Sequence, residues 1–287
     1  FFFKQKTAYE IPKRDWSSDV CSSDLETQRA LQHLEDVIMV EGANNVAAIL
    51  LETVVGTNGI LVPPPGYLEG VREICNRTGI VMICDEVMAG FGRCGEWFAV
   101  DHWKVTPDLI CFAKGVNSGY IPLGGVIISD KISATFRERA FPGGLTYSGH
   151  PLACASAVAS INIFKEEKIV EHARHLGNDI IGPELAKLKD KHPSVGDVRG
   201  LGVFWAIELV RDRATREPLV PFNAAGADNK PMVDVITACK AQNLWPFTHF
   251  NRMHVVPPLV ITDQEMRDGL AIIDEALNVA DSYYTGK

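Results

Sequence analysis

The 287-residue sequence has no apolar run long enough to cross a bilayer, which argues against a transmembrane protein. No apolar core follows the basic residues Lys4 and Lys6, so the start of the chain does not have the pattern of a secretory signal. The chain also has no excess of positive charge. Its net charge is −8, which argues against nucleic acid and anionic membranes as partners. With 46% hydrophobic and 22% charged residues, the composition is that of an ordinary globular protein.

Paired cysteines are missing as well. The seven cysteines form no CxxC motif, and several lie in apolar runs, where a free thiol behaves as a small hydrophobe. A reducing cytoplasm is therefore the simplest compartment for this protein. His249, His254 and Asp263 match no known ligand spacing, so we expect no metal site.

Residues 1–25 do not have the pattern of a natural N-terminus. Acidic residues such as Glu10 and Asp15 argue against an organellar transit peptide. When back-translated, residues 3–10 and 15–25 resemble the two constant parts of a sequencing-library adapter, and the residues between them span its variable index. We therefore predict that 1–25 is a non-native leader without tertiary contacts, and that the match to related chains starts at about Glu26.

The first half of the chain alternates between helical and strand patterns. Helical patterns cover 26–41 and 67–79. Short, almost wholly apolar runs lie at 46–52, 79–86, 108–114 and 124–130. Runs that are buried on both faces are typical of a mainly parallel sheet. This alternation predicts an α/β layer.

The second half has a different pattern. From Pro151 a long helical stretch is predicted, with a break at Gly182-Pro183. Beyond it we expect strands around 195–210, 244 and 254, and helices at 231–242 and 263–280. These elements indicate a second, α+β domain. We place the domain boundary near 165, so that the domains are 26–165 and 166–287.

Polar residues follow two of the apolar runs. Asp85 and Glu86 end one run, and Lys114 ends another and is followed by Gly115. Ligands of open α/β sheets bind at the carboxyl edge of the strands, where these residues are expected. A lysine that is desolvated there can form a Schiff base with a carbonyl compound. Taken singly, the carboxylates fit a solvated turn equally well, and a lone lysine at a strand end usually snorkels to solvent.

Two further stretches belong to the same prediction. Small and hydroxyl residues in "GGLTYSGHPLACASAVA" lead through Pro151 into a helix, and free amides at a helix start suit phosphate. Small residues also permit plain helix packing, so this signal is weak alone. In "LETVVGTNG", Glu52 ends a strand at the presumed ligand edge.

In order and spacing, these stretches resemble the class III aminotransferases, which are pyridoxal-phosphate enzymes of fold type I, the aspartate-aminotransferase fold. The longest such stretch is "DEVMAGFGRCGEWFAVDHWKVTPDLICFAKG", and the resemblance covers residues 26–287. It implies a partial large domain with a mainly parallel sheet and a small C-terminal α+β domain. The stretches "VVPPLVITDQEM" and "VRGLGVFWAIEL" are most similar to the branch that takes amines and ω-amino acids with pyruvate, including taurine–pyruvate aminotransferases.

The resemblance implies roles for particular residues. Lys114 would hold pyridoxal phosphate covalently and shuttle a proton, and Asp85 would keep the pyridine nitrogen protonated. Val87 would press on one face of the ring, and Glu52 would line the site. Thr146 would reach the phosphate in the neighbouring subunit, which implies a homodimer or a higher homo-oligomer.

The resemblance implies roles for some further residues with less direct support. Arg252 is a candidate for binding a substrate carboxylate, and Trp97 for lining the substrate entrance; both types of residue are also common in exposed loops and cores. Four loop residues would hold the turn after Asp85, namely Glu86, Gly92, Arg93 and Gly95. Two positions depart from the family pattern. Family members often have proline at the position of Thr53, and glutamine or isoleucine at the position of Met88.

The expected function is that of an aminotransferase fragment whose parent moves an amino group from an amine or ω-amino acid to pyruvate or another 2-oxo acid. An aminomutase or a decarboxylase of the same fold needs Lys114 and Asp85 equally, so these activities stay open. A non-catalytic chain that keeps the motif is a third possibility. The family's upstream segment, with its phosphate loop and stacking aromatic residue, is not in this sequence, so we predict that the chain is inactive alone.

Overall fold

The computed structural model describes residues 20–286. These residues form two compact units, one within 20–47 and 63–80 and the other within 48–62 and 81–286. This division does not test the boundary predicted near 165, because it separates two helices from the rest of the chain. None of the helices that the structure describes is long and apolar enough to cross a membrane.

The first unit is a pair of helices, α1 (Val20–Glu41) and α2 (Tyr67–Thr78). A Cβ at Gly70 would clash with the side chain of Leu31, so glycine permits the close approach of the two helices. The Arg77 guanidinium pairs with Glu35 across them. Helix α1 begins six residues before Glu26, because nothing in that part of the sequence breaks a helix. The prediction for residues 1–19 lies outside the described part of the chain.

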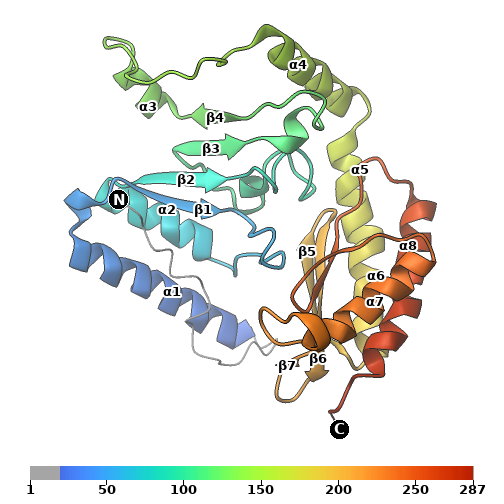
Figure 1. Ribbon diagram of the computed structural model, residues 1–287. Coiled ribbons are helices and arrows are strands. Elements are labelled where there is room, and N and C mark those ends of the chain that lie inside the picture. Colours follow the sequence, from blue (N-terminus) through green and yellow to red (C-terminus); the bar gives the residue numbers. More distant parts are fainter. Residues whose placement is uncertain (1–19, 287) are drawn as a thin grey trace. The chain divides into compact units, whose positions relative to one another are not determined.

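The second unit contains a four-stranded sheet in the order β1-β2-β3-β4 (Figure 1). Its strands are β1 (Ala48–Glu52), β2 (Val81–Asp85), β3 (Leu109–Phe112) and β4 (Gly125–Ile128). The first three are parallel, and β4 runs antiparallel to β3. The predicted α/β class with a mainly parallel sheet is thereby confirmed. Helix α3 (Asp130–Thr135) follows β4, and α4 (Pro151–Glu166) follows a long connection.

A second sheet, antiparallel throughout, has the order β5-β6-β9-β8, and β7 pairs with β6. Its strands are β5 (Val195–Leu201), β6 (Phe204–Asp212), β7 (Glu217–Pro218), β8 (Phe247–His249) and β9 (Arg252–Val255). One face packs on α5 (Ile169–His175), α6 (Gly182–Lys191), α7 (Lys230–Ala241) and α8 (Asp263–Asp281). Buried side chains such as Ile207, Met253 and Leu277 form the core between them. The predicted α+β character of this part is confirmed.

The break predicted at Gly182-Pro183 is wrong. The chain stays helical from Ile169 to Lys191 through a π-helical turn at Leu176–Ile181. Proline lacks an N–H, and the wider turn ahead of it lets the helix continue without the missing hydrogen bond. At Gly182 a Cβ would lie 3.1 Å from the Trp205 ring, so glycine also lets the helix pack against β6.

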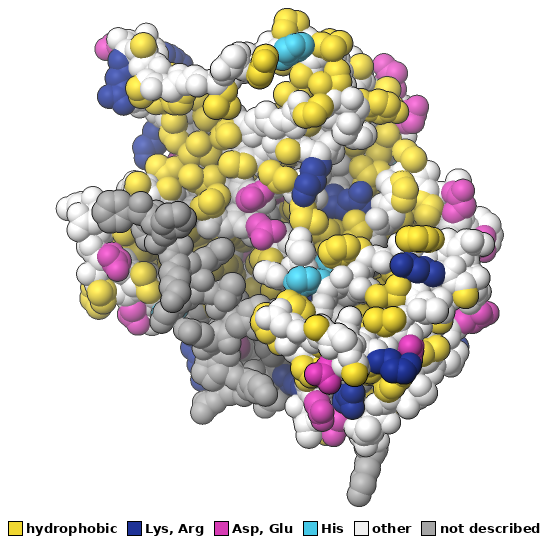
Figure 2. Space-filling model, in the orientation of Figure 1, with side chains coloured by type: hydrophobic (Ala, Val, Ile, Leu, Met, Phe, Trp, Pro, Cys, Tyr) yellow, Lys and Arg dark blue, Asp and Glu magenta, His cyan; other side chains and the backbone are white. Residues whose placement is uncertain are grey.

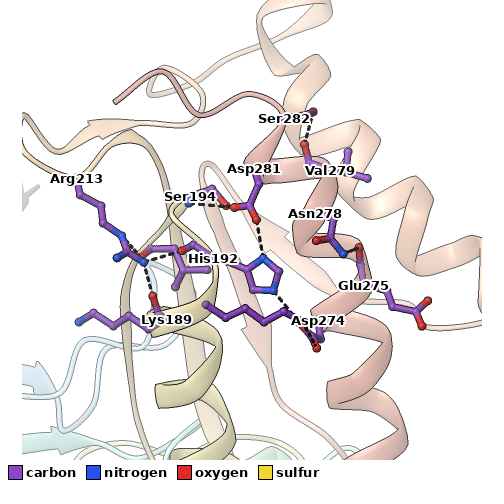
Figure 3. A network of polar contacts seen from close by, with 12 residues as sticks. Lys189, His192, Ser194, Arg213, Asp274, Glu275, Asn278, Val279, Asp281 and Ser282 are labelled. Carbon is purple, nitrogen blue, oxygen red and sulfur yellow. Dashed lines mark hydrogen bonds and ion pairs between the residues drawn. The ribbon is translucent and has the colours of Figure 1, made fainter. Parts of the chain in front are cut away.

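Helix α8 is tied to the α6–β5 turn by the polar network in Figure 3. His192 is 1% exposed, and its Nε2 and Nδ1 lie 2.6 Å from Asp274 Oδ1 and 2.7 Å from Asp281 Oδ2. The Ser194 hydroxyl donates to Asp281 at 2.6 Å. The Arg213 guanidinium donates to the carbonyl oxygens of His192 and Lys189. These bonds hold the C-terminal helix on the second sheet.

Candidate active site

The carboxyl ends of the three parallel strands bring three of the predicted site residues to one edge of the first sheet: Glu52, Asp85 and Lys114. Glu52 is the register partner of Asp85, and Asp85 is the partner of Cys111. Lys114 follows Cys111 by three residues and begins a short 3₁₀ turn, Lys114–Val116. The ladder continues beyond the strands through Glu86 N–H to Cys111 O at 2.9 Å, which keeps neighbouring strand ends aligned.

Asp85 is half-buried at the end of β2. Its Oδ1 accepts a hydrogen bond from the Val87 N–H at 2.9 Å, so the carboxylate is oriented by its own turn. Within residues 20–286 no lysine, arginine or histidine pairs with Asp85. A carboxylate without a cationic partner at a ligand edge suits a cationic group on a ligand.

Lys114 has an unusual backbone. Its φ is +41°, in the left-handed region that side-chain-bearing residues rarely adopt. Gly115 lets this turn pack closely on Phe91, because a Cβ at Gly115 would lie only 2.8 Å from Phe91 Cβ. The Lys114 side chain is exposed, and no hydrogen bond or ion pair of its amine is found in the described part of the chain. The desolvation expected for this amine is therefore not present in this chain.

Glu86 has a structural role. It is 1% exposed, and its carboxylate accepts hydrogen bonds from the N–H groups of Ala99 and Val100, both at 2.9 Å. Those two amides begin the 3₁₀ turn Ala99–Trp103. Burial raises the pKa of the Glu86 carboxyl. This arrangement supports the predicted role of Glu86 in holding the loop.

The chain between Phe91 and Trp97 forms a tight turn. The Phe91 N–H donates to Trp97 O at 2.7 Å, and the Gly92 N–H donates to Glu96 O at 3.0 Å. The Trp97 ring packs on Phe164 of α4, with 5.8 Å between ring centroids. Trp97 is thus part of an aromatic cluster with Phe91, and its predicted contact with substrate stays a prediction.

The remaining predicted residues lie in different surroundings. Glu52 is exposed, and its carboxylate accepts the Gly56 N–H at 2.9 Å, so it orders its own turn. Thr146 lies in an exposed loop, and no hydrogen bond joins its side chain to the described residues. Helix α4 starts at Pro151 and has no side-chain cap, and the phosphate contact at its start stays a prediction.

Arg252 belongs to a charged cluster on the second sheet. Arg252 Nε lies 3.3 Å from Glu208 Oε2, and Arg199 Nη2 lies 2.7 Å from the same oxygen. Burial alone would raise the pKa of Glu208, but the two arginines outweigh it and hold the pKa below its ordinary value. Arg199 also donates to Gly59 O at 2.9 Å, which anchors the loop after Glu52. These pairings favour a structural role for Arg252 over substrate binding.

Two contacts near the site were missed by the sequence reasoning. The Met88 sulfur lies 3.9 Å from the Thr57 hydroxyl, and a Cβ at Gly56 would clash with it, so the Asp85 loop packs on the Glu52 turn. The cluster of Arg199, Glu208 and Arg252 was also missed. Alternating charged residues along neighbouring strands, with period two, are the signal that indicates such a cluster.

Comparison with known proteins identifies the family of this chain. A profile of class-III aminotransferases matches residues 3–277. The chain is 34% identical over 269 residues to a taurine–pyruvate aminotransferase of Bilophila wadsworthia, covering 91% of this chain and 58% of that protein. It is 43% identical over 189 residues to a putrescine–pyruvate aminotransferase of Pseudomonas aeruginosa, covering 66% of this chain and 41% of that protein.

A solved structure is similar over most of the chain. Taurine:2-oxoglutarate aminotransferase from Bifidobacterium kashiwanohense, in complex with pyridoxal phosphate and glutamate, superposes with a TM-score of 0.86 at 40% identity. The match covers 91% of this chain and 57% of that structure, so the chain spans little more than half the length of such relatives. The predicted fold type I and the pyridoxal-phosphate dependence of the family are confirmed. The chain belongs to the class-III aminotransferase family.

Proposed function

We propose that the protein to which this chain belongs transfers an amino group from an amine or ω-amino acid to pyruvate or another 2-oxo acid, with pyridoxal phosphate as cofactor. One observation carries the proposal: Asp85 and Lys114 follow neighbouring parallel strands at one sheet edge, each without a side-chain ion partner among residues 20–286. The substrates named for the taurine and putrescine aminotransferases support the amine and pyruvate part of it.

The residues present fit this cofactor. An exposed primary amine with no ion partner in the described chain, as on Lys114, can condense with an aldehyde. The oriented, half-buried carboxylate of Asp85 suits a protonated ring nitrogen. Both groups come from the ends of rigid strands, which hold a site more firmly than loops do.

When bound, pyridoxal phosphate supplies an electron sink for the substrate's carbon atom. Asp85 holds the proton on the ring nitrogen, because its negative charge favours the cationic ring. The amine of Lys114 would take a proton from the substrate carbon as a base and would then give it back as an acid. Val87, whose amide is bonded to Asp85, limits water on one face of the ring.

We further propose a homodimer or higher homo-oligomer in which Thr146 contacts the cofactor phosphate of the partner subunit. Its exposed loop, 137–150, supports this proposal because it leaves the side chain accessible to a second subunit. We expect the protein in the cytoplasm, because four cysteines of the described part of the chain have free thiols: Cys94, Cys111, Cys154 and Cys239.

The test uses the protein encoded by the complete gene. Borohydride reduction in the presence of pyridoxal phosphate is expected to fix the cofactor on the peptide that contains Lys114. Lys104→Ala is the matched control, because Lys104 is also exposed and has a φ of +52°. Lys114→Ala is expected to abolish the adduct and the formation of alanine from pyruvate, whereas Lys104→Ala retains both.

An adduct on another lysine would reject the role of Lys114. Release of carbon dioxide, or an isomerised substrate without alanine, would replace aminotransfer by decarboxylation or mutase activity. A panel of amines, including taurine and putrescine, would identify the donor.

A further inference from the structure

The tip of the 91–97 turn is bonded to the C-terminal part of the second unit through Arg93. The guanidinium donates to Pro257 O at 2.6 Å and to Val203 O at 3.2 Å. The backbone takes part as well, because the Val203 N–H donates to Arg93 O at 3.0 Å. The turn is therefore attached both to the start of β6 and to the Pro257-Pro258 segment.

Placing the Arg93 guanidinium at this contact costs desolvation free energy. The Arg93 side chain is only partly exposed, and burial lowers its pKa to about 10. Within residues 20–286 no carboxylate pairs with it, so only carbonyl oxygens offset the lost hydration. A poorly solvated cation without a counter-ion is rarely kept for stability alone, because apolar packing of the same volume costs less.

The same turn is held from two other directions. Arg174 of α5 donates to Gly95 O at 3.1 Å and pairs with Glu96 at 2.8 Å. At Gly202, in the β5–β6 turn, a Cβ would clash with the backbone of Cys94 and Gly95. The tip is thus packed backbone to backbone against the β5–β6 turn.

The base of the turn is bonded to the residues that carry Asp85. The Gly90 N–H donates to Glu86 O at 2.9 Å, and the Glu86 carboxylate accepts the amides of Ala99 and Val100. Asp85 in turn accepts the Val87 N–H. Hydrogen bonds at the tip and at the base of the turn, joined by the backbone between Gly90 and Arg93, therefore connect Pro257 to the residues around Asp85.

We propose that Arg93 is a positioning residue that couples the Pro257-Pro258 segment to Asp85 and Val87. The orientation of the Asp85 carboxylate then depends on the docking of the C-terminal part against the 91–97 turn. The coupling matters for catalysis only if the proposed function is right. The coupling itself does not depend on that function.

Amide hydrogen exchange of the protein encoded by the complete gene, measured before any cofactor is added, tests the coupling. Arg93→Met removes the guanidinium, and Arg93→Lys keeps the charge but cannot reach both carbonyl oxygens. In both variants the amides of Val87, Ala99 and Val100 are expected to exchange about tenfold faster or more, because the bonds that protect them lose their support.

Arg213→Met is the matched control. Arg213 also donates to backbone carbonyls, those of Val195 and His192, but it does not touch the 91–97 turn. This variant is expected to speed exchange near 192–196 and to leave the Val87, Ala99 and Val100 amides within about twofold of the unchanged chain.

Unchanged exchange at Val87, Ala99 and Val100 in both Arg93 variants would overturn the proposal. A uniform rise at all amides would overturn it too, since that result means general destabilisation. In the complete protein, Arg93→Lys is expected to shift the pH midpoint of the bound cofactor's absorption band, a signature that a change in stability does not produce. If the unsubstituted complete protein forms no adduct at Lys114, the proposed function fails while the exchange result still stands.

Discussion

Asp85 and Glu86 are neighbours in sequence, yet their carboxylates have different surroundings. The Asp85 carboxylate is half-buried at the sheet edge and has no ion partner in the described chain, whereas Glu86 is buried and bonded to two backbone amides. Successive side chains of an extended chain point in opposite directions, so one residue faces the ligand edge and the next faces the loop. Substitutions at the two positions should therefore affect different properties.

Replacing Asp85 with Asn keeps its shape and removes its charge. The half-reaction with an amine is expected to slow by about three orders of magnitude or more, because the ring nitrogen is no longer held protonated. Single-turnover kinetics on the complete protein measure this. Near-normal rates with the cofactor bound would contradict the role of Asp85.

The raised pKa of the Glu86 carboxyl predicts that the stability of the protein depends on pH. Burial raises its pKa above the ordinary 4.5, so the folded protein holds this proton more tightly than the unfolded chain does. Its contribution to the free energy of unfolding is therefore full below pH 4.5 and falls as the pH rises from 4.5 toward the raised pKa. Denaturation of Glu86→Gln across this range should lack that decline.

Glu265 provides a control of opposite sign. Hydrogen bonds from Thr262 lower the pKa of its carboxyl, so its contribution is lost as the pH falls. If Glu86→Gln and Glu265→Gln change the pH profile in the same direction, the account of Glu86 is wrong.

Among the elements, the β5–β6 turn and the 91–97 turn show how backbone packing joins two parts of one unit. Gly202 has a φ of +54°, and a Cβ there would clash with Cys94 and Gly95. Gly226 has a similar φ of +57°, but nothing lies within 4 Å of a Cβ built there. An alanine at Gly226 would therefore introduce backbone strain alone, whereas an alanine at Gly202 would add a steric clash.

Gly226→Ala is expected to destabilise the chain by about 1–2 kcal/mol, the cost of a left-handed alanine. Gly202→Ala should cost about 1–3 kcal/mol more, because two backbones must move apart. Urea denaturation of both variants gives the difference. Equal losses would show that the two turns are not packed as closely as described.

On the scale of the whole chain, apolar surface is left uncovered. The last three residues of β4 are exposed on both faces: Val126, Ile127 and Ile128. Helix α4 exposes Leu152, Val158 and Ile163. Figure 2 shows apolar side chains gathered over this region of the second unit. Open edge strands with apolar side chains favour association with other chains.

We expect the 287-residue chain to bind pyridoxal phosphate weakly, to produce no alanine from pyruvate and amine, and to self-associate. Val126→Lys places a charge on the edge strand and is expected to raise the concentration at which the chain stays monomeric, measured by light scattering. Lys131→Arg, which keeps the charge of an exposed residue in α3, is the control and should leave association unchanged. Robust turnover by this chain alone would refute the prediction.

The local sequence pattern determined the main elements and the edge at which the site lies. Apolar runs followed by Asp85 and Lys114 are sufficient to predict parallel strands whose carboxyl ends meet, because that information is contained in a few consecutive residues. The strands and the last helix lie within a few residues of their predicted bounds for the same reason.

Only the tertiary structure decided how distant residues pair. Arg252 pairs with Glu208, which also binds Arg199; Trp97 packs on Phe164; and the helix that continues past Gly182 packs on Trp205. Each of these outcomes depends on partners tens of residues away, and propensity and periodicity carry no information about such partners. A charged or aromatic side chain can satisfy its chemistry with a ligand or with another part of the chain, and the free energy of the folded whole decides between them.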